Sequence, residues 1–249
     1  MKAIILAAGY ATRLYPLTKD TPKGLLEVGG KTIMDHLMEK LVANPSIDEI
    51  HVVSNHRFAG QFQRWADEAA KRYGNIRLTV WDDNTTSNEN RLGAIGDMRF
   101  VIERAGIDDD LLVAASDNLM DAPLTDFFED FRVHGRDLLL AGRLEDEEER
   151  KRFAVLELDG GRIVGLTEKP EHPASDVVAY ATYLYRRDTV GQIAEYLAAG
   201  GNPDSPGHFP EWLHKRKEMR ACVYRGRCVD IGTVESYRST CAEWANRKG

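Results

Sequence analysis

The sequence predicts a three-layer α/β/α fold around a mainly parallel mixed sheet, with a smaller antiparallel part in the second half. Three observations support this prediction. The 249 residues, 43% of them hydrophobic, are enough to bury a full core. Apolar runs alternate with amphipathic stretches in the first half, which is typical of βαβ units. In the second half, two strand-like runs meet at Asp159-Gly160-Gly161, a hairpin signal.

The first half contains four apolar runs that predict buried strands, at residues 2–8, 47–55, 76–83 and 109–118. Three amphipathic stretches between these runs predict helices, at residues 32–43, 58–74 and 93–106. In the first of them Ile33, Leu37 and Leu41 share one face. Ligands of parallel sheets bind beyond the carboxyl ends of the strands. The polar residues at 9–13 and 116–118 are therefore the places where we expect a site.

The second half contains a mixture of strands and helices. Strands are expected at residues 136–144, 152–170 (two strands of a hairpin), 176–188 and 220–232 (two short strands and a turn). A helix is expected at residues 189–201, with Gly200 just past its end, and a closing helix at residues 234–248. The charge run at residues 145–152 is expected to be a solvated surface.

The composition argues against several classes of function. A net charge of −7 does not suit nonspecific nucleic-acid binding, which needs a basic surface. The apolar run at residues 3–8 is too short for a membrane span or a signal-peptide core. Cys222, Cys228 and Cys241 are odd in number and lack CxxC spacing, so neither a disulfide framework nor a zinc site is expected. We therefore expect a cytoplasmic protein that binds neither nucleic acid nor membrane.

The loop after the first strand combines a glycine with two cations. Gly9 lacks a Cβ and can bring backbone N–H groups close to an anion. Arg13 offers a planar fork to a phosphate and Lys23 a compact point charge. Neither GxxxxGK[ST] nor GxGxxG is present, so the usual ATPase loop and the dinucleotide fingerprint are not indicated. The loop is compatible with polyphosphate binding and, equally, with an ordinary surface loop.

The stretch LAAGYATRLYPLTKDTPKGLLEV, residues 6–28, resembles the opening signature of the sugar-1-phosphate nucleotidylyltransferases, and the likeness extends along essentially the whole chain. The resemblance implies a Rossmann-like fold of the nucleotide-diphospho-sugar transferase, GT-A-like type. It implies Arg13 and Lys23 as catalytic residues. The nucleotide-binding residues that it implies are Leu6, Ala8, Gly9, Ala11, Thr12, Asn90 and Gly93. Ala11 stands where the family usually has glycine, and Gly24 where proline is common.

Two later stretches resemble the family's metal-binding motifs. AASDN, residues 114–118, is similar to a strand that ends in G-D-N, with Ser116 in place of the glycine. RCVDIGTVESY, residues 227–237, is similar to W-x-D-I-G-T-P-x-x-Y. The resemblance makes Asp117 and Asp230 ligands of Mg²⁺, which favours carboxylates together with substrate phosphates. Because the two aspartates are far apart in the sequence, we expect their strand ends to converge.

The stretch GLTEKP, residues 165–170, resembles the segment of the family that binds the sugar phosphate. Glu168 would accept hydrogen bonds from sugar hydroxyls, and Lys169 would hold the phosphate. Ala154 and Tyr180 complete the substrate-binding residues that the resemblance implies. Ala154 replaces a glycine and Tyr180 a smaller residue, which predicts an acceptor different in shape from glucose 1-phosphate unless neighbouring loops compensate.

The implied reaction joins a nucleoside triphosphate to a sugar 1-phosphate by in-line attack with Mg²⁺, giving an NDP-sugar and pyrophosphate. We expect one domain over residues 1–249, with a nucleotide-binding half at about 1–130 and a sugar-phosphate-binding half at 131–249. The two substrates are the expected partners, and assembly as a homo-oligomer stays open. Two alternatives remain: a cytidylyltransferase acting on a non-sugar phosphate such as phosphocholine, and a non-catalytic nucleotide-sugar sensor.

Overall fold

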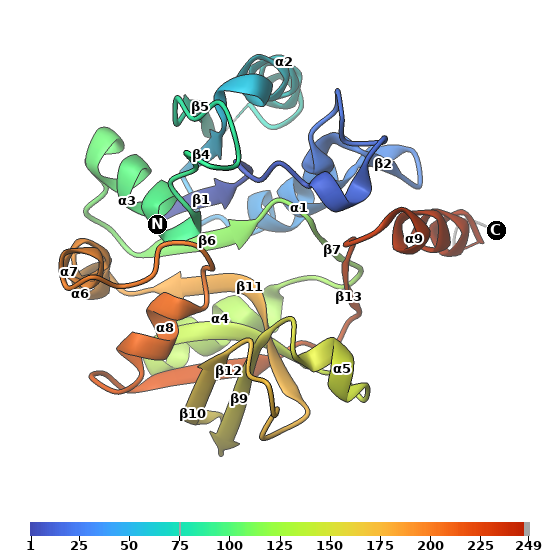
Figure 1. Ribbon diagram of the computed structural model, residues 1–249. Coiled ribbons are helices and arrows are strands. Elements are labelled where there is room, and N and C mark those ends of the chain that lie inside the picture. The colour runs from blue at the N-terminus through green and yellow to red at the C-terminus, as the bar shows by residue number, and fades with distance from the viewer. Residues whose placement is uncertain (75, 247–249) are drawn as a thin grey trace.

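The computed structural model describes residues 1–74 and 76–246, and within them nine strands form one mixed sheet (Figure 1). These strands are β1 (Lys2–Leu6), β4 (Glu49–Ser54), β5 (Arg77–Asp82), β6 (Leu111–Ala115), β8 (Asp137–Arg143), β9 (Ala154–Asp159), β10 (Arg162–Glu168), β11 (Val177–Tyr185) and β12 (Met219–Val223). Their order in the sheet is β5-β4-β1-β6-β11-β8-β12-β10-β9. The predicted α/β fold with a mixed sheet is confirmed.

The first four strands of this order are parallel, as the βαβ pattern predicts. In register, Lys2 of β1 lies opposite both Glu49 of β4 and Leu111 of β6. The neighbouring residues Ile4 and Ile5 of β1 belong to two different hydrophobic cores, one on each face of the sheet. A strand covered on both faces needs apolar side chains at successive positions, which explains the continuous run in the sequence.

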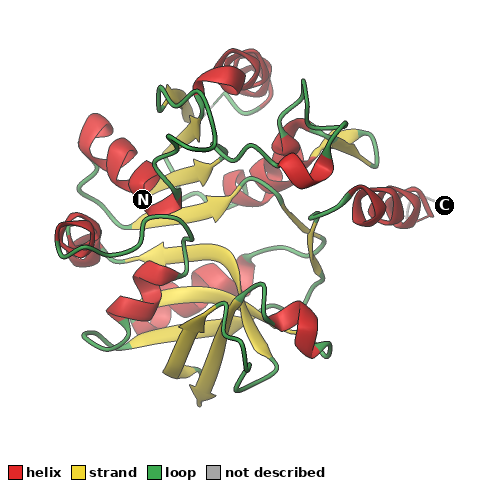
Figure 2. Ribbon diagram, in the orientation of Figure 1, coloured by secondary structure: helices red, strands yellow, loops and turns green. Residues whose placement is uncertain are grey.

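Helices cover both faces of the sheet (Figure 2). They are α1 (Ile33–Val42), α2 (His56–Arg72), α3 (Ala94–Ala105), α4 (Thr125–His134), α5 (Glu147–Arg150), α6 (Arg187–Val190), α7 (Gln192–Ala198), α8 (His208–Leu213) and α9 (Val234–Asn246). Side chains of α1, α2 and α4 pack with Ile5, whereas side chains of α3, α7 and α8 pack with Ile4. No helix among the described residues is both long and apolar enough to span a membrane.

Local signals account for the helix ends. Thr32 and Asp35 form a capping box at the start of α1, and Asn55 caps α2 through its side chain. The helix expected at residues 189–201 is divided at Gly191 into α6 and α7. Helix α4 was not anticipated, although Phe127 and Phe131 on its buried face have helical spacing. Of the predicted closing helix, α9 extends to Asn246, and residues 247–248 lie outside the described part of the chain.

The second half of the sheet is mostly antiparallel. Strand β11 runs antiparallel to both β6 and β8, and β9 and β10 form the predicted hairpin. Strand β12 lies parallel to β8. Because β9 also pairs with β11, the strands β11, β8, β12, β10 and β9 form a closed ring of pairings.

Two small sheets lie beside the large one. Strands β2 (Glu27–Val28) and β3 (Lys31–Thr32) form a hairpin, and β7 (Asn118–Met120) pairs with β13 (Cys228–Asp230). The strand predicted at residues 109–118 therefore stops at Ala115, because the chain turns and joins a different partner in β7. Helix α9 packs beside the blue loop that carries β2 (Figure 1).

Candidate functional site

The loop that follows β1 is shaped by two short 3-10 turns, Thr12–Leu14 and Lys23–Leu25. Ala11 precedes the first turn with φ of 47°, in the left-handed region that glycine adopts readily. The Thr18 hydroxyl donates to the Ala11 carbonyl oxygen at 2.8 Å and holds the backbone there. The glycine that the family usually has here suits this left-handed backbone conformation. Alanine at position 11 adopts the same conformation at a steric cost of about 1 kcal/mol.

The end of the chain fixes the same loop from outside. The Tyr237 hydroxyl donates to the Glu27 carbonyl oxygen at 2.8 Å, and Trp244 packs against Gly29. A separate hydrophobic cluster joins the loop to β7, β13 and α9, and its buried members are Leu14, Leu26, Val28, Ile33, Leu119, Ile231 and Trp244. Segments from both ends of the sequence therefore build one wall of the candidate site.

Lys23 lies between the two aspartates that the sequence analysis assigned to a metal. Its Nζ donates to Asp117 Oδ2 at 2.7 Å and to Asp230 Oδ1 at 3.0 Å. The pairing of β7 with β13 places Asp230 opposite Asn118, the residue after Asp117. The expected convergence of two distant carboxylates is therefore observed, and a two-stranded sheet produces it.

Charge and burial oppose each other in this cluster. The Lys23 side chain is only 11% exposed. Burial disfavours its charged form, but the carboxylates of Asp117 and Asp230 outweigh burial and raise its pKa. Burial likewise opposes ionisation of Asp117, yet Lys23 and then Arg13 hold the pKa of Asp117 below its usual value. The cluster therefore contains an ionised lysine and an ionised Asp117.

A cavity of 220 Å³ opens beside this cluster. Six of the predicted site residues line it, namely Leu6, Gly9, Ala11, Arg13, Lys23 and Asp117. Ile231 and Gly232, which follow Asp230, also line it. Ala8 contributes its carbonyl oxygen to the Asn55 side chain at 2.9 Å, so it helps to fix the loop. Thr12 lies in the first 3-10 turn and is exposed.

Two departures from the family motif contact each other in this cavity. A Cβ on Gly24 would lie 3.3 Å from both the Cβ and the carbonyl oxygen of Ser116, and 3.0 Å from the Met34 side chain. Gly24 therefore leaves room for the Ser116 side chain and backbone, which a larger residue at position 24 would crowd.

The segment expected to read the base contains Asn90 and Gly93. The Asn90 side-chain oxygen accepts from the backbone N–H groups of Thr86 and Ser87 at 3.1 and 3.0 Å, so it orders its own loop. Gly93 has φ of 80°, and a Cβ there would lie 2.5 Å from the Pro203 carbonyl oxygen. Neither residue lines the 220 Å³ cavity, although Ala94, at the start of α3, does.

A buried carboxyl pair lies under this loop. Asp83 and Asp97 are 6% and 5% exposed. Asp83 Oδ1 accepts from the backbone N–H and the hydroxyl of Thr85, both at 2.7 Å. Burial, reinforced by the neighbouring Asp83, raises the pKa of Asp97 to about 8. Asp97 therefore carries a proton near neutral pH, and neither aspartate was singled out from the sequence.

On the acceptor side, Glu168 and Lys169 contact the segment at residues 205–207, which was not predicted to belong to the site. Lys169 Nζ donates to Ser205 Oγ at 2.5 Å, and its backbone has φ of 48°. A Cβ on Gly207 would lie 1.9 Å from Glu168 Oε2, so that carboxylate lies directly on the glycine backbone. Burial raises the pKa of Glu168 against the opposing charges of Lys169 and His208. Ser205 and Gly207 therefore belong to the candidate site.

Ala154 lies beside these residues, whereas Tyr180 does not. Ala154 pairs with Glu168 in the β9–β10 hairpin and faces Gly207. Tyr180 is buried in the core on the opposite face of the sheet from Ala154, and its ring covers Gly142 on the neighbouring strand β8. It lines a separate polar cavity of 730 Å³ that also borders Asp230. The structure therefore brings Ala154, Glu168 and Lys169 together and places Tyr180 apart from them.

Arg152 also reaches this site, with Nη2 3.7 Å from Asp230 Oδ2. The charge run at residues 145–152 was expected to be a solvated surface, and Arg152 is exposed as predicted although it also faces Asp230. Arg150 is instead half-buried, and its Nη1 donates to the Ser175 carbonyl oxygen at 2.9 Å. A count of charges in the sequence does not reveal either contact.

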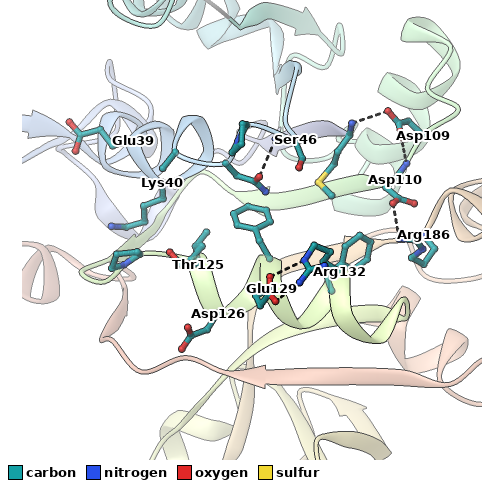
Figure 3. Close-up of a pocket in the computed structure, with 18 of the residues that line it drawn as sticks. Glu39, Lys40, Ser46, Asp109, Asp110, Thr125, Asp126, Glu129, Arg132 and Arg186 are labelled. Carbon is teal, nitrogen blue, oxygen red and sulfur yellow. Dashed lines mark hydrogen bonds and ion pairs between the residues drawn. The ribbon is translucent and has the colours of Figure 1, made fainter.

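Another cavity, of 880 Å³, lies away from these groups, between α1 and α4 (Figure 3). It borders Met1 and Asp110, which precede β1 and β6, whereas the candidate site follows those strands. Its acidic rim is largely paired: Asp110 with Arg186 at 2.8 Å and Glu129 with Arg132 at 2.6 Å. None of the site residues predicted from the sequence lines this cavity, whereas six of them line the cavity of 220 Å³.

The chain is similar to known proteins in sequence. The chain matches a family model described as nucleotidyl transferase over residues 2–247. It is 29% identical over 240 residues to a Sulfolobus acidocaldarius protein provisionally named mannose-1-phosphate guanyltransferase. This match covers 95% of the present chain and 61% of the Sulfolobus protein. It is 31% identical over 186 residues to a UTP–glucose-1-phosphate uridylyltransferase of Haloferax volcanii, covering 74% of this chain and 72% of the relative. The chain thus spans less than two thirds of the Sulfolobus protein.

A solved structure has a similar fold. A Bacillus anthracis protein, provisionally named glucose-1-phosphate thymidylyltransferase, superposes with a TM-score of 0.81 at 24% identity. The match covers 99% of this chain and 96% of that one. At this level of identity the likeness supports the α/β fold with a mixed sheet.

Proposed function

Because the chain belongs to the nucleotidyl transferase family, we propose that it joins a nucleoside triphosphate to a sugar 1-phosphate, giving an NDP-sugar and pyrophosphate. The resemblance to the sugar-1-phosphate nucleotidylyltransferases is confirmed at the level of the family. The observation that carries the proposal is the contact of Lys23 with both Asp117 and Asp230 beside the cavity of Gly9 and Arg13.

The reaction requires one anion to approach another. An oxygen of the acceptor phosphate attacks the α-phosphorus of the nucleotide, a new P–O bond forms, and the bond to the β-phosphate breaks to release pyrophosphate. The acceptor phosphate is already ionised near neutral pH, so its oxygen needs no general base. Catalysis then depends on position and on the neutralisation of charge.

The proposed roles follow from position. Arg13 stabilises the departing pyrophosphate, and Lys23 neutralises the region of the α-phosphate. The loop at Gly9 and Ala11 lines the cavity and lets the polyphosphate approach the backbone. Lys169 binds the phosphate of the acceptor, and Glu168 accepts hydrogen bonds from its hydroxyls.

The donor set suits Mg²⁺ as the cofactor. The carboxylates of Asp117 and Asp230 both contact the Lys23 ammonium. Carboxylate oxygens are ligands that Mg²⁺ favours. Within the described residues no group of three or more His, Cys, Asp or Glu side chains is placed to hold a metal. Substrate phosphates would therefore complete the coordination by Asp117 and Asp230. When bound, the ion neutralises charge on the reacting phosphates.

An activity matrix tests the proposal. Purified protein is incubated with Mg²⁺, one of UTP, dTTP, GTP or CTP, and one of glucose 1-phosphate, mannose 1-phosphate or phosphocholine, and pyrophosphate release is measured. We expect release with at least one sugar phosphate. Faster turnover of phosphocholine than of either sugar phosphate would favour the cytidylyltransferase alternative. Nucleotide binding without pyrophosphate release from any pair would favour a non-catalytic sensor.

A further inference from the structure

Three consecutive cations at the end of α5 have three different environments. Arg150 is turned into the protein, where it donates to the Ser175 carbonyl oxygen. Lys151 pairs with Glu148 on the exposed side of the same short helix. Arg152 points the other way, toward Asp230. Within the charge run, Arg152 therefore contacts the candidate site, whereas Lys151 pairs with another residue of the run.

The guanidinium of Arg152 lies against the backbone of the site. A Cβ on Gly232 would be 2.5 Å from Arg152 Nη2, so the guanidinium covers this glycine, which lines the 220 Å³ cavity. Lys23 already contacts Oδ1 of Asp230, and Arg152 faces Oδ2. Arg152 is 43% exposed, so its fork is open to a ligand. Asp230 is thus flanked by two cations.

Arg152 is also connected to the acceptor side. The next residue, Phe153, accepts the backbone N–H of Lys169 at its carbonyl oxygen, at 3.0 Å. The residue after that, Ala154, pairs in register with Glu168. Movement of Lys169 or Glu168 would therefore be transmitted to the backbone that carries Arg152. Arg152 and Lys169 therefore lie on hydrogen-bonded neighbouring segments of backbone, with Arg152 beside Asp230 and Lys169 beside Ser205.

We propose that Arg152 is a second phosphate-binding residue for the acceptor, acting with Lys169. This inference rests on the proposed function. A planar guanidinium can hold two oxygens of one phosphate, whereas an ammonium acts as a point charge. A divalent cation held by Asp117 and Asp230 would neutralise the charge of Asp230, and the Arg152 fork would then bind the incoming phosphate and hold it in line for attack.

The test compares Arg152→Ala with Lys151→Ala, which removes the neighbouring cation outside the site. Steady-state pyrophosphate release is measured with the best sugar phosphate and nucleotide of the activity matrix, varying each substrate in turn. For Arg152→Ala we expect the KM for the acceptor to rise about 10- to 100-fold, since a charged hydrogen bond is lost. The KM for the nucleotide should stay within about twofold. Arg152→Lys should recover part of the loss, and Lys151→Ala should match the wild type.

Four results would overturn the inference. An unchanged acceptor KM in Arg152→Ala, with the wild type active, would show that Arg152 does not bind the acceptor. A rise confined to the nucleotide KM would place Arg152 on the other substrate. An equal loss in Lys151→Ala would indicate a general effect of surface charge. Absence of turnover in the wild type with every pair would instead refute the proposed function, and this inference with it.

Discussion

The two halves of the sheet build their parts of the site in different ways. Strands β5, β4, β1 and β6 are parallel, and the loop after β1 lies next to the turn after β6 at one edge of the sheet. Strands β11, β8, β12, β10 and β9 are mostly antiparallel, and their site residues depend on contacts between loops. Lys169 meets Ser205, and Arg152 meets Asp230. The order of the parallel strands therefore brings the loop of Gly9 and Asp117 to one edge, whereas the acceptor side depends mainly on contacts between loops.

This difference predicts how substitutions should separate. A change at the shared cluster of Lys23 should abolish turnover itself. A substitution of Lys169, on the acceptor side, should raise the KM for the sugar phosphate alone. A substitution of the buried Asp97 should change the stability of the fold more than the rate of the reaction.

Lys23→Ala should lower kcat/KM about 1,000-fold, because it removes the cation that contacts both carboxylates of the site. Pyrophosphate release under saturating Mg²⁺ measures the effect. Lys19→Ala, an exposed cation of the same loop, is the matched control and should retain near-normal activity. A loss of less than tenfold in Lys23→Ala would remove Lys23 from the catalytic machinery.

Lys169→Ala should raise the KM for the sugar phosphate about 10- to 100-fold and leave the KM for the nucleotide nearly unchanged. Its hydrogen bond to Ser205 links it to the segment that also contacts Glu168 through Gly207. Initial rates with each substrate varied in turn give both constants. If the nucleotide KM rose more than the acceptor KM, the division of the site into two sides would be wrong.

Asp97→Asn should stabilise the protein increasingly as the pH rises. Burial raises the pKa of Asp97 to about 8, above its unfolded value, so its ionisation opposes folding. The stability that the folded protein has with neutral Asp97 is fully present below about pH 4 and is lost as the pH rises to about 8. Over this range the free energy of unfolding falls by about 1.4 kcal/mol per pH unit at most. Asparagine cannot ionise and should remove this dependence.

Thermal melts at about pH 5 and about pH 8 measure that change. The gain in Tm of Asp97→Asn over the wild type should be larger at the higher pH. Asp67→Asn, on the exposed face of α2, is the control and should show no such trend. Equal gains for Asp97→Asn at both values would mean that Asp97 is ionised in the folded protein.

Ala11→Gly should stabilise the protein slightly, by up to about 1 kcal/mol, because glycine adopts the positive φ of this position without steric cost. The larger freedom of glycine in the unfolded chain offsets part of the gain. Chemical denaturation measures the free energy of unfolding. A loss of more than 1 kcal/mol would show that the Ala11 methyl group makes packing contacts that outweigh the backbone strain.

The sequence predicts the nucleotide side better than the acceptor side, for a physical reason. The run at Ala3–Leu6 and the amphipathic pattern at Ile33, Leu37 and Leu41 express local periodicity, and the structure confirms both elements. The family motif also located Asp117 and Asp230, and the β7–β13 pairing brings them together. Neither small strand was predicted to pair with the other, because three-residue strands carry no periodic signal.

Arg152 and Asp97 show what the sequence does not reveal. Arg152 belongs to a run of charges that has the composition of a solvated surface, and its approach to Asp230 depends on the turn after α5. Asp97 lies in the first turn of a helix, where an exposed carboxylate is common, and its burial depends on packing near Asp83. Both roles depend on tertiary contacts between segments.

The most direct test of the account is the position of a bound divalent cation. We propose a crystal structure of the protein with Mn²⁺ and UTP, in which anomalous scattering locates the metal. The account predicts Mn²⁺ coordinated by oxygens of both Asp117 and Asp230, with the Lys23 ammonium moved onto a phosphate oxygen. Mn²⁺ bound away from either carboxylate, with Lys23 still bridging them, would contradict it.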